Sequence, residues 1–357
     1  MKNNRPAPLA DTSAPTAQLA GSGWTAFWFS PVQPVGLHWL RVLCGLLFLC
    51  WLLPFADHQA EVFSLAGWCD RQAYLEMPDA PGSPPVPAWS LVYLCGDNAG
   101  LVRALWWTAI GVFLLFTMGV ATRVTSVLTW LFVASFVANP ATYFEADFLQ
   151  IIPAFYLMIG YVLLGQWNGQ RALLARLVGT RDTLFSPWGE TRNTGPSYAA
   201  NLAVRLFQVH FAIIVFTGCL SKLQFGDWWS GVAFWYPLHN PFAMNAERLR
   251  SESQYAEALL FFLSLTQYLV LAWQLSFPFF AWRPRWRWLL LSGGVLGWIG
   301  SVFILGEPLF GPIYLIGCLS FLSPAEWQAL TNWTVGLVQG WTRSAKVQPG
   351  KKVSVRS

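Results

Sequence analysis

Long runs of apolar residues, separated by short polar or charged stretches, recur along the whole chain. Eight such runs, each bounded by charged residues, Gly or Pro, predict helices at residues 37–55, 103–121, 124–141, 147–165, 202–221, 256–280, 288–305 and 308–323. A helix needs about 20 residues to cross the hydrocarbon core of a bilayer, which is about 30 Å thick. The pattern therefore predicts an all-α bundle with about eight transmembrane helices, of which the last is the shortest.

Composition agrees with a chain that lies mostly in a membrane. Hydrophobic residues make up 55% of the sequence and charged residues only 11%, whereas about 25% of the residues of an average soluble domain are charged. A soluble fold with so few charges could not cover its surface. We expect a multi-pass integral cell-membrane protein with a transmembrane domain at 28–325, a flexible cytoplasmic tail at 1–27 and a basic cytoplasmic tail at 326–357.

The distribution of charge indicates which ends of the helices face the cytoplasm. Lys and Arg are retained on the cytoplasmic side of membrane proteins. If successive helices alternate in direction, most of the 22 Lys and Arg residues, Arg41 and Arg205 among them, fall on one side, and most of the 17 Asp and Glu residues on the other. This predicts cytoplasmic termini and two outer loops, 56–102 and 222–255. The net charge of +5 is thereby explained without a nucleic-acid partner, and the partner expected is the lipid bilayer.

Cysteines and aromatic residues add little chemistry. Cys69 and Cys95 both lie in the first outer loop, where they could form a disulfide or remain free thiols. No Cys/His spacing resembles a metal site, and no catalytic motif of a hydrolase, a zinc protease or a nucleotide-binding protein is present. Trp and Tyr cluster near the ends of the predicted helices, where their rings suit the headgroup level. We expect most of them to be interface anchors.

Lys222 is the unusual ionisable residue, because it ends the fifth apolar run in the string TGCLSKLQFGDWW. Ionisable groups at a membrane edge are candidates for function. Helical periodicity places Gly218 and, deeper, Gln208 on the same face, and Ser221 is a small neighbour that would let a ligand approach. An amine partly removed from water favours its neutral form and can act as a general base.

Other readings of this region remain open. Lys222 could simply extend to the interface and pair with Asp227 or Asp147. Asp147 opens the fourth helix, so it either caps that helix or serves as the counter-ion of Lys222. His210, in the middle of its helix, is predicted to be a hydrogen-bonded core histidine. His239, in the second outer loop, either belongs to a turn or lines the mouth of a pocket.

Several strings, taken together and in order, resemble the HTTM family, whose members are related to the membrane portion of vitamin K-dependent gamma-carboxylase. The strings are LHWLRVLCGLLFL (37–49), GVATRVTSVLTW (119–130), NPATYFEADFLQIIP (139–153), RLFQVHFAIIVFTGCLSKLQFGDWWSG (205–231) and QLSFPFF (274–280). The resemblance covers residues 28–325. Its sharpest element is the small-residue helix end followed by SKL, then DWW and Gly.

The resemblance implies a role for Lys222. The matching lysine of the carboxylase is regarded as the base that acts on vitamin K hydroquinone, on the lumenal side of its membrane. By analogy, Lys222 is the candidate base for a quinol-like lipid at the extracytoplasmic side, with Asp147 and Asp227 as supporting groups. A quinone or quinol is the implied cofactor or lipophilic ligand, and no metal is implied. The pocket candidates are Gln208, His210, Gly218, Ser221 and His239.

The chain also departs from the family pattern. Many relatives carry a histidine in the helix after the QLSFPFF-like string, where this chain has Trp298. The carboxylase has a large lumenal domain after its membrane part, whereas this sequence ends soon after its last predicted helix, so a propeptide-bearing protein substrate is not expected. Some relatives resemble components of a bacterial toxin system. A non-enzymatic role in partner binding or immunity, or a lipid or small-molecule carrier, therefore remains an alternative.

Overall fold

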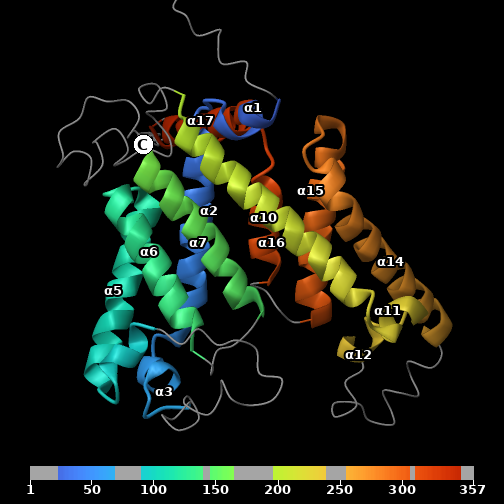
Figure 1. Ribbon diagram of the computed structural model, residues 1–357, viewed down its shortest axis with the longest axis horizontal. Helices are drawn as coiled ribbons and strands as arrows, with labels where there is room; N and C mark the ends of the chain where they lie inside the picture. The colour runs from blue at the N-terminus through green and yellow to red at the C-terminus, as the bar shows by residue number, and fades with distance from the viewer. Residues whose placement is uncertain are drawn as a thin grey trace, which may run out of the picture.

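The computed structural model describes residues 23–68, 90–139, 145–164, 196–238, 255–305 and 310–346. The regular structure of these residues is helical, and the one pairing of extended backbone among them is an isolated antiparallel bridge between Val32 and Ser197. The predicted all-α class is therefore confirmed. Figure 1 shows a bundle of roughly upright helices, crossed by one strongly tilted helix, with shorter helices at both ends.

Helices lie at every position where an apolar run predicted one. They are α2 (Val35–Leu52), α5 (Ala99–Met118), α6 (Thr122–Val137), α7 (Glu145–Leu163), α10 (Tyr198–Lys222), α14 (Ala256–Phe280), α15 (Pro284–Gly300) and α16 (Phe310–Leu319). A 3-10 turn (Leu53–Phe55) extends α2, and a π-helical turn (Ser301–Leu305) extends α15. In the described part of the chain, α2 with its extension, α5, α10 and α14 are long and apolar enough to cross a membrane. The others are shorter, and α6 and α7 are likewise apolar.

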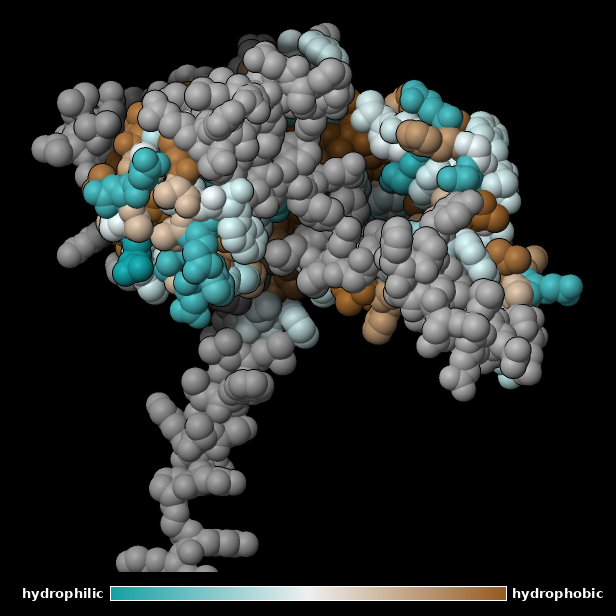
Figure 2. Space-filling model, turned by 90° about the horizontal axis from the view of Figure 1, so that it is seen from below, coloured by the Kyte–Doolittle hydropathy of each residue, from teal (hydrophilic) through white to brown (hydrophobic). Residues whose placement is uncertain are grey.

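The long helices run alternately in opposite directions (Figure 1). Segments of both predicted outer loops consequently lie at one end, here named the α3 end, which carries α3 (Gln59–Phe63), α11 (Gly226–Ser230) and α12 (Trp235–Leu238). The opposite, α17 end carries α1 (Gly23–Phe29) and α17 (Pro324–Lys346). Figure 2 looks onto the α3 end, where hydrophilic residues gather over two separate regions. Segments of both loops therefore lie at the same end of the bundle, as predicted.

Part of each predicted tail is helical. α17 begins where the Ser323 hydroxyl accepts from the backbone N–H of Glu326 at 3.3 Å and the Glu326 carboxylate accepts from the backbone N–H of Ser323 at 2.6 Å. This reciprocal capping box satisfies the first N–H groups of a helix. The segment expected as a tail from residue 326 therefore continues as a helix, and α1 begins inside the tail expected at 1–27.

Packing of apolar side chains fixes α17 to α2. Trp327 is fully buried, and its ring stacks on that of Trp39 at 6.1 Å between centroids. The Trp39 indole N–H donates to the Thr331 hydroxyl at 2.9 Å. Gly36 lies directly against the Trp327 ring, where a larger side chain would collide with it. The sequence pattern missed this helix because α17 is amphipathic and carries no long apolar run.

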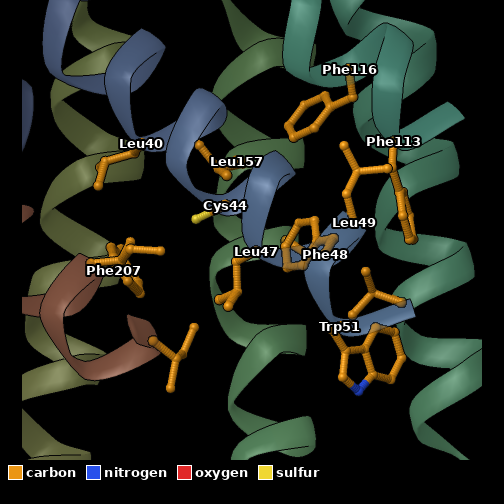
Figure 3. Packing of buried hydrophobic residues seen from close by; sticks show 14 of the residues in the cluster. Leu40, Cys44, Leu47, Phe48, Leu49, Trp51, Phe113, Phe116, Leu157 and Phe207 are labelled. Atoms are coloured by element: carbon orange, nitrogen blue, oxygen red, sulfur yellow. The ribbon is translucent and has the colours of Figure 1, made fainter. Parts of the chain in front are cut away.

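α2 forms the centre of the core. Figure 3 shows its residues facing helices on both sides, with Phe48 directed toward Phe113 and Phe116 of α5. The rings of Phe48 and Phe113 lie 5.7 Å apart. Gly45 of α2 packs directly on Thr117 of α5, where any Cβ would collide. The close approach of these two helices therefore depends on a missing side chain.

α10 and α14 position the region around Lys222. α10 starts among α1, α2 and α7 at the α17 end and crosses the bundle obliquely, so that its last turns lie against α14 (Figure 1). Most of α14 is exposed, including large apolar side chains such as Phe261, Leu269 and Phe279. A helix surface of this kind suits contact with lipid. Its buried face is narrow and is directed at α10 and α11.

Candidate functional site

Lys222 is the last residue of α10 and lies at the α3 end. Its ammonium donates to the backbone carbonyl of Gly218 at 3.3 Å and stands 5.5 Å from the centre of the Trp228 ring. Side chains of a helix lean toward its N-terminus, and this one follows that direction. The ammonium therefore turns back by one turn along α10 instead of extending outward past the helix end.

The segment after Lys222 is tied to α14 through one amide. Gln267 is completely buried, with 0% exposure. Its Nε2 donates to the backbone carbonyls of Asp227 at 3.1 Å and Trp228 at 2.6 Å, and its Oε1 accepts from the N–H of Ala233 at 2.8 Å. A side chain in a largely apolar helix thus satisfies three backbone groups of an irregular segment.

Two more side chains of α14 complete this attachment. The Tyr268 hydroxyl donates to the carbonyl of Trp229 at 2.7 Å, and the Ser264 hydroxyl donates to that of Gly231 at 2.8 Å. Residues three and four apart share one face of a helix, so Gln267 and its two neighbours hold the segment from the same side. Gly231 has a φ of +83°, which glycine adopts without strain. The ring of Trp228 is thereby held close to Lys222.

Gln274 is a second buried amide on α14, two turns beyond Gln267, and the sequence analysis did not single it out. Its exposure is 5%, and its Oε1 has no hydrogen-bond partner among the described residues. A Cβ built on Gly218 would lie 3.8 Å from Gln274 Nε2 and 3.8 Å from Lys222 Nζ. Both polar groups therefore border the space that Gly218 leaves open. The signal in the sequence is a pair of glutamines seven residues apart in an apolar helix.

Asp147 lies in a different environment at the α3 end. It is nearly buried on α7, and its carboxylate is hydrogen-bonded to the indole of Trp51 on α2. The alternatives predicted for Asp147 were a helix cap and a counter-ion for Lys222, and the partner that the structure gives its carboxylate is the Trp51 indole. The ends of α7 and α10 diverge here, because α10 inclines toward α14 (Figure 1). Gln150, one turn deeper on α7, is buried with its Oε1 unpartnered among the described residues.

The other residues predicted around the α3 end are only partly drawn together. The Asp227 side chain is exposed, and its backbone carbonyl is the group in use. Ser221 is exposed beside Lys222, and His239 lies outside the described residues. Trp298 is half-exposed and lies against Gly311.

Gln208, a pocket candidate predicted deeper on the face of Lys222, has its hydrogen-bond partners far from that lysine. Gln208 Nε2 donates to the carbonyl of Ser320 at 2.6 Å, and its Oε1 accepts from Arg205 at 2.9 Å. These partners lie toward the α17 end, because a rise of about 1.5 Å per residue separates Gln208 from Lys222 by about 21 Å along the helix. His210 is hydrogen-bonded through Nδ1 to the Tyr156 hydroxyl at 2.9 Å. The expectation of a hydrogen-bonded histidine is confirmed.

The possible disulfide in the first outer loop is not formed. Cys95 carries a free thiol, whose Sγ lies 3.8 Å from the carbonyl of Leu91. It ends the short 3-10 helix η3 (Val92–Cys95). Cys69, its possible partner, lies outside the described residues. Burial raises the pKa of the Cys95 thiol, so the thiol is less reactive near neutral pH than an exposed one.

A polar cluster lies inside the bundle. Arg41, which the charge pattern assigned to the cytoplasmic side, is 1% exposed. Its guanidinium occupies the space beside Gly119, whose φ is +83°, and bonds to the Tyr161 hydroxyl. That hydroxyl also bonds to His38 at 2.8 Å. The negative end of the α5 dipole at Gly119 suits a cation, which explains how an arginine is tolerated inside the bundle.

One cavity lies among α2, α7 and α10, away from Lys222. Its lining is apolar and includes Leu40, Cys44, Leu157 and Phe207, four residues drawn in Figure 3. Its volume is about 10 Å³, which is enough for a single water at most. Lys222 does not line this cavity.

Comparison of the chain with protein-family models, curated proteins and solved structures found no match. The resemblance to the HTTM family therefore rests on the sequence strings alone. A role for Lys222 taken from that resemblance is accordingly a proposal. Within the described residues, no three His, Cys, Asp or Glu side chains are grouped as metal ligands would be.

Proposed function

We propose that the protein is an HTTM-like membrane enzyme in which Lys222 is the base that deprotonates a quinol-like lipid. The observation that carries the proposal is the position of the ammonium. It lies one turn back along α10, between the carbonyl of Gly218 and the ring of Trp228. An amine directed at the membrane interior from a helix end can meet the head group of a lipid that enters from the bilayer.

The proposed orientation has all eight helical segments within the membrane, the termini in the cytoplasm and the α3 end outside. Its support is the retention of Lys and Arg on one side in the sequence, together with the alternating directions of the helices (Figure 1). Exposed tryptophans at both ends, such as Trp24 and Trp229, suit the two headgroup regions. Catalysis by Lys222 would then occur on the extracytoplasmic side.

The proposed chemistry is a single proton transfer. The neutral amine of Lys222 takes a proton from a quinol hydroxyl, which leaves a quinolate that dioxygen can oxidise. The ammonium formed is stabilised by the carbonyl of Gly218 and by the face of the Trp228 ring, since a cation is attracted to an aromatic face. Gln267 contributes by holding Trp228 in place.

The test is oxidation of a short-chain ubiquinol by the full chain reconstituted in lipid vesicles. We expect Lys222→Ala to lose the activity, and Lys222→Arg to lose it as well, because a guanidinium keeps the charge but is never neutral. Thr217→Ala, at an exposed residue of α10 whose hydroxyl bonds to the carbonyl of Ile213 in its own helix, is the control that should retain activity. Unchanged oxidation in Lys222→Ala, or none in the parent protein, would reject the enzymatic proposal.

A non-enzymatic role in partner binding or immunity is the second candidate. It is favoured by the well-filled core, in which the cavity near α2 holds one water at most, and by exposed apolar side chains at the α3 end. Trp68 is 73% exposed and Leu94 75%. Under this alternative, co-purification of a partner would survive Lys222→Ala and be lost when residues 56–102 are replaced. The reverse result would favour the first proposal.

A further inference from the structure

Gln274 is a buried amide that the fold leaves unsatisfied. Its side chain is 5% exposed, and its Oε1 has no hydrogen-bond partner among the described residues. Placing an amide in an apolar surrounding without hydrogen bonds is strongly unfavourable, and such groups are rare in native proteins. The residue therefore calls for an explanation other than stability.

Gln267, on the same helix, is a buried amide whose oxygen and nitrogen both form hydrogen bonds. All three of its hydrogen bonds go to backbone groups that the segment after Lys222 presents to α14. Gln274 instead faces regular helix, where the α10 carbonyls and N–H groups bond to one another. The two helices are in contact at this level, since the Cys219 Sγ lies 3.6 Å from the carbonyl of Leu271.

The amide borders a gap that it shares with a cation. Gln274 Nε2 and Lys222 Nζ lie at the same distance, 3.8 Å, from the position of the missing Cβ of Gly218. An amide offers a donor and an acceptor, whereas an ammonium offers only donors. Together they form a polar patch between α10 and α14, two helices that are mostly apolar.

We propose that Gln274 and Lys222 bind one hydroxyl-bearing ring head of a lipid, with Gln274 as the positioning residue. A hydroxyl can donate to Oε1 and accept an N–H of the Lys222 amine, so one group of the ligand can bond to both side chains before any proton is transferred. A carboxylate or phosphate ester lacks the donor that Oε1 requires. The inference deepens the proposed function, on which it rests for the class of ligand, by assigning recognition to the hydroxyl.

The experiment measures binding and not turnover. The full chain in detergent is titrated with a short-chain ubiquinol and with its dimethyl ether, which lacks both hydroxyls, and dissociation constants are obtained by equilibrium dialysis. The parent is expected to bind the quinol about tenfold or more tightly than the ether, because a site built for a hydroxyl discriminates against an analogue without one. Equal affinity for the two, or no binding of the quinol, would overturn the inference.

The substitution Gln274→Leu measures how much the amide contributes to quinol binding. Loss of one net hydrogen bond should weaken quinol binding about five- to tenfold and leave ether binding unchanged. Without ligand, the midpoint of thermal unfolding should not fall, because leucine removes an unsatisfied polar group. Ser276→Ala is the control, since that hydroxyl donates to its own helix at the carbonyl of Ala272, and it should behave as the parent.

Other outcomes separate this inference from the proposed function. Parent-like quinol affinity in Gln274→Leu, or a large drop in its unfolding temperature without ligand, removes the role of Gln274, while ubiquinol oxidation that depends on Lys222 would still stand. If the protein binds quinol through Gln274 but oxidises no ubiquinol, the binding site is supported and the enzymatic proposal is rejected.

Discussion

Gln267 ties three backbone groups of the segment after Lys222 to α14. A net hydrogen bond contributes only about 1 kcal/mol, but leaving its partner buried and unpaired costs about 1–3 kcal/mol. A single amide with three bonds is therefore expected to matter more for stability than its polarity in an apolar helix suggests. The same residue sets the place of Trp228 beside Lys222.

We predict that Gln267→Leu lowers the free energy of unfolding by about 2–4 kcal/mol, because two carbonyls and one N–H lose their common partner. Chemical unfolding of the protein in detergent measures the change. Thr266→Ala, at the exposed neighbouring residue whose hydroxyl bonds within its own helix, should shift stability by less than about 1 kcal/mol. Equal effects of the two substitutions would show that the amide is not what holds the segment.

At the scale of elements, α17 joins the bundle through a charged group at its start. Arg287 of α15 forms an ion pair with Glu326, and the Ser323 hydroxyl and N–H also donate to that carboxylate, each at 2.6 Å. Burial by itself would raise the pKa of Glu326, but the bonds from Ser323 and the charge of Arg287 outweigh it and hold the pKa below its usual value. One carboxylate thus caps α17 and fastens it to α15.

The attachment of α17 is therefore expected to depend on pH. A carboxyl whose pKa is lower in the folded than in the unfolded state stabilises the fold above the unfolded value, about 4.3 for Glu, and this stability is lost as the pH falls through the folded pKa. Hydrogen exchange of α17 amides, corrected for intrinsic rates, should show protection weakening below about pH 4. In Glu326→Gln, protection should be lower by about 1–2 kcal/mol at pH 6 and change little with pH.

Glu257→Gln, at an exposed acid in the first turn of α14, is the matched control and should leave the exchange of α17 unaffected. The interpretation would fail if Glu326→Gln kept the same dependence on pH as the parent. The sequence did contain a signal for this helix, because Ser323-Pro-Ala-Glu326 reads as a capping box with Pro at the first helical position. A search for long apolar runs does not detect this capping box.

For the whole molecule, direction in the membrane is the property that organises the rest. The helices alternate, and segments of both acidic loops lie at the α3 end (Figure 1). α16, with 10 residues, rises by only about 15 Å, half the thickness of a hydrocarbon core. The structure thus supports the order and direction of the helices. It gives less support to the expectation that every helix spans the membrane by itself.

Labelling of Cys95 tests the direction of the whole chain. With every other cysteine replaced by serine or alanine, a membrane-impermeant maleimide added to intact cells should modify Cys95 if the α3 end is outside. Because burial raises the pKa of this thiol, labelling should accelerate several-fold from pH 7 to pH 8, as the thiolate fraction grows. Modification only after the cells are opened would place the α3 end, and Lys222 with it, inside.

The sequence by itself determined the helical class, the positions of the long helices and the end at which Lys222 lies. These follow from apolar run length and charge, which are properties of neighbouring residues. Only the tertiary structure decided that Gln267 is satisfied while Gln274 is not, and that Arg41 is enclosed beside Gly119. Periodicity assigns a side chain to a face of its helix, but the partner of that face depends on which helices touch and where a missing side chain leaves space.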